Sequence, residues 1–417
     1  MYKPLSLAVA AVALALPATA SAAWSPPTQL SGAEESNPIA QAAFGGSVLT
    51  GWLEPTAAVS KQLGAPRAIT AADPYETVWQ GGLDKDGNAV VVTVRKHKPV
   101  QRVRAIFVSA DGAKTPARTI SQAGHSASGP VMDVAPDGTA AAVWAWHDPA
   151  GWRVQAAIRR PGQASFDPPQ TLSGPGPVSG RYQSRPFTRI AAGTGGRAAI
   201  SWQFGGSGDF PEAPLQVATA GTDAKFGAAQ ALGPALGYAD ADLAVSPAGT
   251  VEVAWLDEHF TNHGPNPALR AASGAAGAPL GEPATLSTGG KGTSSGTQVA
   301  TAFAADGTPI VAWAKPGDKY EDGGTLEVFR NGAEQALAEH AEGLQLDGDA
   351  LAWMTHATGK WTVHASVAGS PDTVISDPAH NALWPSIALT PTGAIAAWVT
   401  NDNGGGSGRP TAAMFAR

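Results

Sequence analysis

The chain has 417 residues, no cysteine and a formal net charge of −7 at pH 7. The absence of cysteine excludes a disulfide framework, and the acidic balance makes nucleic acid and anionic lipid poor partners. Charged residues make up only 15% of the chain, while 50 glycines and 34 prolines indicate frequent turns between short strands. No long segment has a 3.6-residue apolar period, so we discount a helical fold.

The first 22 residues are typical of a bacterial secretory signal peptide. Lys3 precedes an apolar run over residues 5–16, Pro17 follows that run, and small residues lead up to Ala22. The run is shorter than the roughly 20 residues that cross a bilayer as a helix. We therefore expect a Sec-type signal that is cleaved after Ala22, an extracellular mature chain and no membrane span. Without Lys3, the chain carries 34 acidic and 26 basic side chains, a formal charge of −8.

A hairpin recurs along the mature chain. It consists of an apolar strand, a turn with glycine, and a second apolar strand that ends in tryptophan; the clearest copy runs from Val134 through Gly138 to Trp144. Glycine suits these turns because it accepts positive φ without steric cost. The other copies are Gly46 with Trp52, Gly196 with Trp202, Gly249 with Trp255, Gly307 with Trp313, Gly348 with Trp353, Gly393 with Trp398, and a hairpin at Gly87 without tryptophan. We expect the tryptophans to pack between adjacent blades.

A second column is a short outer strand in which an apolar residue is usually followed by Ser or Thr. The apolar residues are Leu30, Ile69, Ile120, Leu172, Leu232, Leu286, Leu337 and Ile375. A further strand, such as Trp361 to Ser366, lies between each hairpin and its outer strand. Each unit therefore contains four antiparallel strands, A to D, as a propeller blade does.

The order of the two columns predicts how the ends of the chain meet. The outer strand at Leu30 precedes the first hairpin, and no outer strand follows the third strand of the last unit, Thr411 to Ala416. Pairing of Pro26–Ser31 with that strand would complete the last unit and remove both exposed edges. The sequence therefore predicts an all-β fold, a single closed β-propeller of about eight four-stranded blades, with seven possible.

The predicted domain spans residues 23–417, after the signal peptide 1–22. Its repeat units are approximately 37–70, 76–121, 129–173, 184–233, 240–287, 296–339, 342–376, and 384–417 completed by 24–31.

Two of the turns resemble those of a known class of repeat. Val134-Ala-Pro-Asp-Gly-Thr and Ala244-Val-Ser-Pro-Ala-Gly-Thr resemble the (Ser)-Pro-Asp-Gly turns of WD40-like repeats in secreted bacterial propellers of the TolB type. The resemblance implies a propeller with a binding or scaffolding surface and brings no catalytic residue with it. Sialidase propellers are more distantly similar: their Asp-box Ser-x-Asp-x-Gly-x-Thr-Trp and their Phe-Arg-Ile-Pro motif are absent, and Arg185-Pro-Phe-Thr-Arg-Ile190 shares only the composition of the latter.

Propellers usually bind ligands on the face that carries the loops between strands B and C and the links from strand D to the next strand A. We call it the link face. Its aromatic and imidazole side chains suit contacts with a sugar ring or a protein, although such residues also simply cover blade ends. The candidate binding residues are Tyr75, Tyr182, Tyr238, Tyr320, Trp384 and His259, with His125 nearby.

Three long loops between strands B and C, in consecutive units, are acidic. They carry Asp209 and Glu212, then Asp257, Glu258, His259 and His263, then Asp318, Glu321 and Asp322. Such an arc suits a cation, a pair of carboxylates for glycosidic cleavage or a basic partner, and ordinary solvated loops are the simpler alternative. If the protein is an enzyme, Asp257 and Glu258 are its candidate catalytic carboxylates.

We expect no cofactor. Ca²⁺ is the one ion for which the sequence contains a candidate segment. The stretch from Asp84 to Asn88 resembles the start of a calcium loop, but it falls on a hairpin turn and lacks the remaining ligands, which favours a plain turn.

The leading functional hypothesis is a secreted, non-catalytic binding or scaffold propeller, a monomer that recognises a glycan or an extracellular protein through one loop face. The alternative is an extracellular carbohydrate-active enzyme, a glycoside hydrolase or lyase of sialidase-like architecture. A purely structural module of the cell envelope is a third possibility.

Overall fold

The computed structural model describes most of the chain after residue 22. The described residues are 23–30, 35–36, 38–43, 47–52, 56–61, 67–70, 76–97, 100–176, 178–179, 182–183, 185–204, 213–235, 241–261, 264–289, 299–315, 324–356, 359–368, 370–390, 392–401 and 407–416. Within these ranges the fold is all-β, and the only helical element is the 3₁₀ turn η1 (Thr194–Gly196). No helix in the described part has the length and apolarity that a membrane crossing requires.

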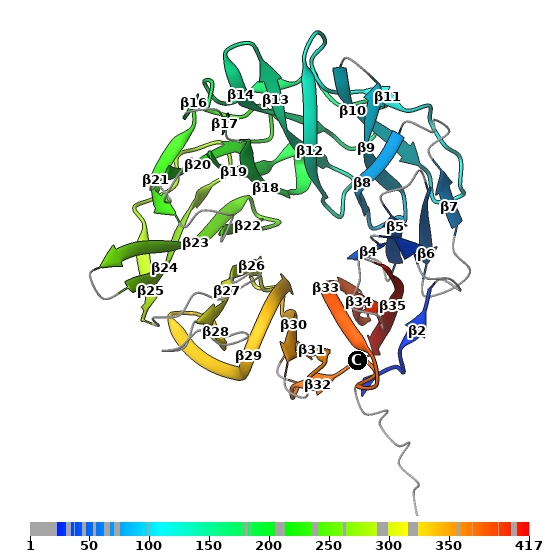
Figure 1. Cartoon of the computed structure of the whole chain (residues 1–417), viewed down its shortest axis with the longest axis vertical. Coiled ribbons are helices and arrows are strands. Elements are labelled where there is room, and N and C mark those ends of the chain that lie inside the picture. The colour runs from blue at the N-terminus through cyan, green and yellow to red at the C-terminus, as the bar shows by residue number, and fades with distance from the viewer. Residues whose placement is uncertain are drawn as a thin grey trace, which may run out of the picture.

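Five four-stranded antiparallel sheets are arranged as propeller blades around a common axis (Figure 1). Blade 1 contains β4 (Pro38–Ala43), β5 (Ser47–Trp52), β6 (Thr56–Lys61) and β7 (Arg67–Thr70). Blade 2 contains β8 (Glu76–Leu83), β9 (Ala89–His97), β10 (Val100–Val108) and β11 (Arg118–Thr119). Blade 3 contains β12 (Ser126–Val134), β13 (Ala140–Asp148), β14 (Gly151–Arg159) and β15 (Gln170–Thr171).

The next two blades follow a small hairpin. The hairpin consists of β16 (Val178–Ser179) and β17 (Tyr182–Gln183). Blade 4 contains β18 (Pro186–Ala192), β19 (Ala198–Phe204), β20 (Ala213–Ala220) and β21 (Gln230–Ala235). Blade 5 contains β22 (Ala241–Val245), β23 (Thr250–Thr261), β24 (Gly264–Ala275) and β25 (Ala284–Thr288).

The last third of the chain forms two larger sheets. The seven-stranded sheet contains β26 (Val299–Phe303), β27 (Pro309–Lys315), β28 (Gly324–Arg330), β29 (Ala333–Asp347), β30 (Ala350–His356), β31 (Trp361–Val367) and β32 (Thr373–Val374). The terminal sheet contains β33 (Asn381–Thr390), β34 (Gly393–Asn401) and β35 (Ser407–Ala416), with β1 (Ala23–Trp24), β2 (Thr28–Gln29) and β3 (Glu35–Ser36) from the other end of the chain.

The β-propeller arrangement agrees with the sequence prediction, but the number of separate four-stranded blades does not. The described part contains five of them, where about eight, or seven, were predicted. The main reason is that β29 continues without interruption through two predicted units. It pairs with β28 as far as Ala341 and with β30 from Ala341 onward, so the two units share one strand.

The predicted pairing of the N-terminal segment with the C-terminal strand is present. Thr28 lies opposite Ala412, and Trp24 lies opposite Phe415, with their ring centroids 5.4 Å apart. The Ser25 N–H also donates to the Met414 carbonyl at 2.7 Å. The two ends of the chain therefore lie in one sheet (Figure 1).

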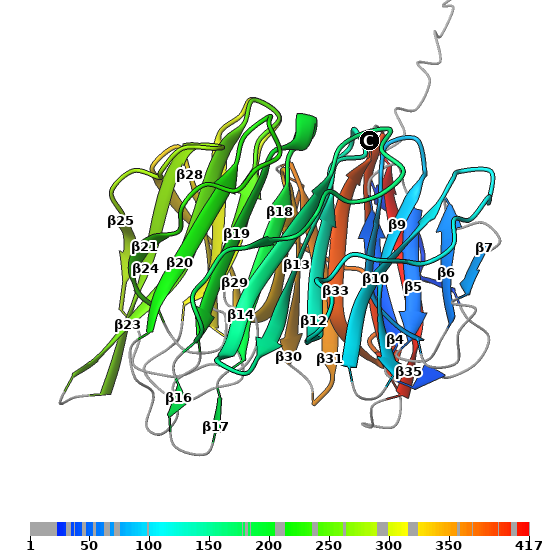
Figure 2. The same ribbon diagram turned by 90° about the horizontal axis from the view of Figure 1, so that it is seen from above.

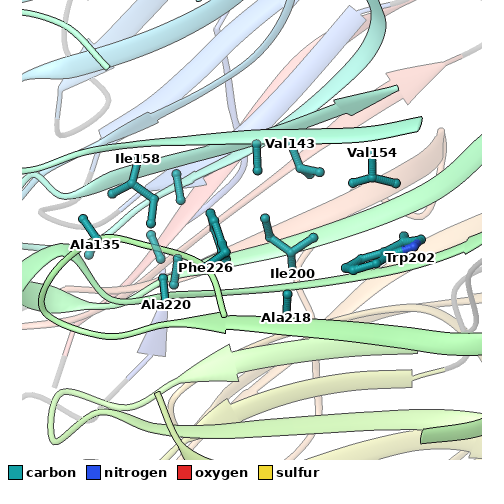
Figure 3. Packing of buried hydrophobic residues seen from close by; sticks show 14 residues of the cluster. Ala135, Val143, Val154, Ile158, Ile200, Trp202, Ala218, Ala220 and Phe226 are labelled. Atoms are coloured by element: carbon teal, nitrogen blue, oxygen red, sulfur yellow. The ribbon is translucent and has the colours of Figure 1, made fainter. Parts of the chain in front are cut away.

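Tryptophan packing between sheets is confirmed. In the described part, the six tryptophans that end the repeated hairpins are at most 2% exposed: Trp144, Trp202, Trp255, Trp313, Trp353 and Trp398. Each belongs to a cluster with side chains of the strands that precede its own hairpin unit, as Trp202 does with Val154 of blade 3 (Figure 3). Large aromatic side chains contribute most to this kind of burial.

Carboxylates connect neighbouring innermost strands. Asp133 accepts the N–H of Ala192 at 2.8 Å, and two further links of this kind repeat around the axis. They run from Thr301 N–H to Asp242 at 2.8 Å and from Leu389 N–H to Asp347 at 2.7 Å. Burial raises the pKa of all three carboxyl groups, that of Asp347 to about 6, and the charge of Asp133 adds to the effect on Asp347.

Hydroxyl groups explain the second sequence column. Ser121, Ser173 and Ser376 each follow the apolar residue of an outer strand. Their Oγ atoms accept the N–H groups of Val103, Val154 and Val363 on the third strand, at 3.2, 2.9 and 2.9 Å. The serine thus holds the short outer strand where regular pairing ends.

The first prediction concerns Glu252 of β23, which is 6% exposed. Burial raises its pKa from 4.5 to about 7. Because the folded state then binds the proton more tightly than the unfolded state, the stability contributed by this group is present at low pH and falls as the pH rises from about 4.5 to about 7. We expect Glu252→Gln to gain about 3 kcal/mol over the parent at pH 8 and nothing at pH 4. Urea unfolding at both pH values measures this, and equal stability at pH 8 contradicts it.

The second prediction concerns the contact between the two ends of the chain. Trp24→Ala removes the ring that packs on Phe415, so we expect a loss of about 2 kcal/mol in the free energy of unfolding. The exposed Val374 of β32 supplies a control, since Val374→Ala removes apolar surface without opening a packed contact. Urea unfolding compares the variants, and a Trp24→Ala protein as stable as the control would show that the pairing contributes nothing.

Candidate functional site

Two imidazole–indole pairs lie where β13 ends in blade 3, on opposite sides of the sheet because Trp146 and His147 are consecutive. The His125 ring packs edge-on against Trp146, with centroids 4.9 Å apart. His147 and Trp152 are directly opposite each other on β13 and β14, and their centroids are 4.8 Å apart. The register thus places an aromatic group where strand B ends and strand C begins, because opposite residues in an antiparallel pair meet on one side of the sheet.

The seven-stranded sheet carries an equivalent pair. His356, the last residue of β30, lies opposite Trp361, the first residue of β31, with ring centroids 4.7 Å apart. The Trp361 N–H donates to the Asn381 side-chain oxygen at 3.0 Å, which ties this pair to the start of β33. These strands lie across the central axis from blade 3 (Figure 1).

Four innermost strands, β8, β12, β29 and β33, contain a β-bulge, and the bulge of β33 is unusual. Gly129 in β12 and Gly343 in β29 have φ values of 55° and 66°. At the corresponding point of β33, Trp384 has φ 54° and is 53% exposed. Its N–H donates to the Met354 sulfur at 3.3 Å. A bulky residue in this region of φ costs on the order of 1–3 kcal/mol, and such strain concentrates at functional sites.

Arg185 lies over the bulge of blade 3. A Cβ atom on Gly129 would fall 1.4 Å from the Nη2 atom of Arg185, so only glycine leaves room for the guanidinium. Arg185 follows the hairpin β16–β17, which projects beyond the ends of the blade strands (Figure 2). Burial lowers the pKa of Arg185, and within the described residues it has neither a hydrogen bond nor an ion pair.

Among the predicted binding residues, Trp384 is the one whose side chain the structure describes. The backbone of Tyr182 lies in β17 and that of His259 in β23, while their side chains lie outside the described part. Tyr75, Tyr238 and Tyr320 also lie outside the described residues. His125 was expected near the binding residues, but its partner Trp146, the other histidine–tryptophan pairs and Arg185 were not predicted, because only strand register and packing bring each of them to its partner.

Asp257 and Glu258 lie within β23 and not in a loop, because that strand continues to Thr261. The Asp257 side chain is 3% exposed and forms an ion pair with Arg270 of β24. Asp257 stands two residues after Trp255, and Lys315 stands two residues after Trp313. Lys315 pairs with Glu327 at 3.1 Å, with the charges reversed between the strands. An ion pair at the same position in two successive units indicates that Asp257 stabilises the pairing of strands B and C.

The plain-turn interpretation of residues 84–88 is confirmed. The Asp84 carboxylate accepts the N–H of Asp86 at 3.0 Å, and the N–H and side-chain amide of Asn88 at 2.8 Å each. The turn itself therefore uses these oxygens. In the described part of the chain, no group of three or more His, Asp or Glu side chains is arranged to hold a metal ion.

No protein-family model matches the chain, and no curated protein matches it. The chain is similar in structure to the β-propeller domain of the Trilobed protease from Pyrococcus furiosus, with 8% identity and a TM-score of 0.46 over 79% of this chain and 92% of that one. It is similar to polysaccharide lyase Uly1, with 9% identity and a TM-score of 0.49 over 89% and 88%. A third similar structure is the α-L-arabinanase of Penicillium chrysogenum complexed with arabinobiose, with 14% identity and a TM-score of 0.38 over 74% and 96%. At such identities the likeness concerns the fold alone.

Proposed function

We propose that this protein is an exported, non-catalytic β-propeller that binds a carbohydrate through its link face. The observation that carries the proposal is Trp384, a half-exposed indole in a backbone conformation that two equivalent strands give to glycine. A tryptophan there is unfavourable for folding alone, both through its backbone strain and through its exposed apolar surface. Its persistence is explained if the indole contacts a ligand.

The chemistry of the surrounding side chains favours a sugar. An indole offers a broad apolar face for the C–H groups of a pyranose, and its N–H gives it a polar edge. Half-buried Trp361 and its partner His356 add a second ring, and Asn381 contributes an amide nearby. Apolar rings with a few polar groups are typical of small-ligand sites.

The enzymatic alternative receives less support. A glycosidase needs two carboxyl groups that reach the substrate. Asp257, the first candidate, is buried and already paired with the Arg270 guanidinium. The proposal therefore assigns Asp257 to folding.

Export and ring closure belong to the same proposal. The signal-like segment ends immediately before β1, and β1 and β2 pair with β35. We propose that this pairing closes the propeller after the signal is removed, so that no long edge of the terminal sheet is left to aggregate outside the cell.

The third prediction tests the ligand role of Trp384. In Trp384→Gly the strained residue takes the identity found in β12 and β29, so we expect an unfolding midpoint equal to or above that of the parent. We also expect loss of the retardation that the parent shows in affinity electrophoresis through gels containing xylan, arabinan, mixed-linkage glucan, dextran or polygalacturonate.

Val374→Ala is the matched control, because Val374 is a similarly exposed apolar residue on the outer strand β32. It should migrate as the parent does in every gel. A Trp384→Gly protein that unfolds at lower temperature and is still retarded would identify Trp384 as a packing residue. A parent that no polysaccharide retards would contradict carbohydrate binding.

The fourth prediction separates the structural from the catalytic interpretation of Asp257. Asp257→Asn leaves the Arg270 guanidinium, which is 32% exposed, without its countercharge, so we expect a loss of about 2 kcal/mol in stability. The double variant Asp257→Leu with Arg270→Met should recover most of this loss. Urea unfolding measures both, and polysaccharide turnover that disappears in Asp257→Asn without any change in stability would instead support the enzyme.

A further inference from the structure

Three guanidinium groups lie toward the link face of blades 2, 3 and 4, although the chain as a whole is acidic. Arg102 donates to the His125 carbonyl oxygen at 2.6 Å. A carbonyl oxygen carries no net charge, so this bond leaves the charge of Arg102 unneutralised. Arg153 is neutralised by Asp148 at 2.8 Å. Arg185 adds a further guanidinium, which no described carboxylate neutralises.

The position of Arg185 is determined by the fold. Its guanidinium rests on the Cα of Gly129, and the bulge of β12 supplies that surface because a residue with φ 55° and no side chain is needed there. Pro186 begins β18 directly after it and restricts the backbone of Arg185. A residue placed in this way binds with less loss of side-chain entropy than a freely rotating surface arginine.

Arg185 is exposed, and the natural complement of a guanidinium that no described carboxylate neutralises is a planar or multidentate anion. One exposed aromatic side chain lies beside the site. Phe187, which is 36% exposed, lies two residues after Arg185 on β18, whereas Trp146 is buried with side chains of blade 2. An apolar ring beside an arginine matches a ligand that has both a ring face and a charged substituent.

We propose that Arg185 binds the carboxylate or sulfate group of an acidic polysaccharide, so that the carbohydrate recognised by the link face is anionic. This inference rests on the proposed function, because it names the class of carbohydrate that the same face takes. The anion's two oxygens accept N–H bonds from the guanidinium, and the exposed Phe187 ring contacts the sugar.

The test is affinity electrophoresis of the full mature chain against polygalacturonate, dextran sulfate and neutral dextran. We expect retardation by at least one of the two anionic polymers, none by dextran, and at least a fivefold rise in the apparent Kd in Arg185→Ala. The comparison of polygalacturonate with dextran sulfate shows whether carboxylate or sulfate is the group bound. Arg185→Gln, which keeps the length and polarity of the side chain, should lose the same affinity.

Arg118→Ala is the control, because it removes an equal charge from the outer strand β11 and should leave retardation unchanged. Equal unfolding midpoints for all variants show that folding is intact. Retardation by dextran that Arg185→Ala does not alter overturns this inference and leaves carbohydrate binding standing. Equal weakening by Arg118→Ala also overturns it, since the effect is then one of net charge. If no polymer of any kind retards the parent, the proposed function itself is wrong.

Discussion

The burial of a tryptophan against the preceding strands, repeated six times in the described part of the chain, is the interaction on which the rest of the structure depends. The chain has no disulfide, so the relative placement of its sheets must come from packing. In a strand, alternate residues face opposite sides, so a tryptophan fixed against the preceding sheet also fixes which residues face the following one. The tryptophan contacts therefore also fix the orientation of the strands whose ends carry the histidine–tryptophan pairs.

The sequence predicted the parts of the fold that depend on local chemistry. Turn glycines such as Gly138, with φ 87°, and outer-strand serines such as Ser173 have the roles that their repeats indicated. The count of separate blades was wrong where local chemistry gave no signal. In β29 the corner falls at His340, which has φ 57°, and neither the motif nor its neighbours mark a break there. Whether a strand ends or turns at such a point depends on the sheets beside it.

The candidate site was predictable only where a single residue carries the signal. Trp384 was found because an aromatic residue stood in a link between units. Arg185 was missed because its place depends on Gly129, and the two meet only when blades 3 and 4 pack together. Asp257 was placed in a loop because its polar neighbours suggested one, but β23 continues through it, and the cross-strand partner Arg270 supplies the charge that makes its burial acceptable.

Two regions of this molecule contain groups whose placement costs folding free energy. The regions differ in the interactions that offset this cost. Around the axis, the buried carboxylates of Asp133, Asp242 and Asp347 each accept an N–H from the next innermost strand, so their cost is offset by bonds that join the sheets. On the link face, the strained backbone of Trp384 makes one N–H bond, to the Met354 sulfur, and no described carboxylate pairs with the exposed guanidinium of Arg185. This difference between the axis and the link face is the physical basis of our proposal that the link face binds a partner outside the chain.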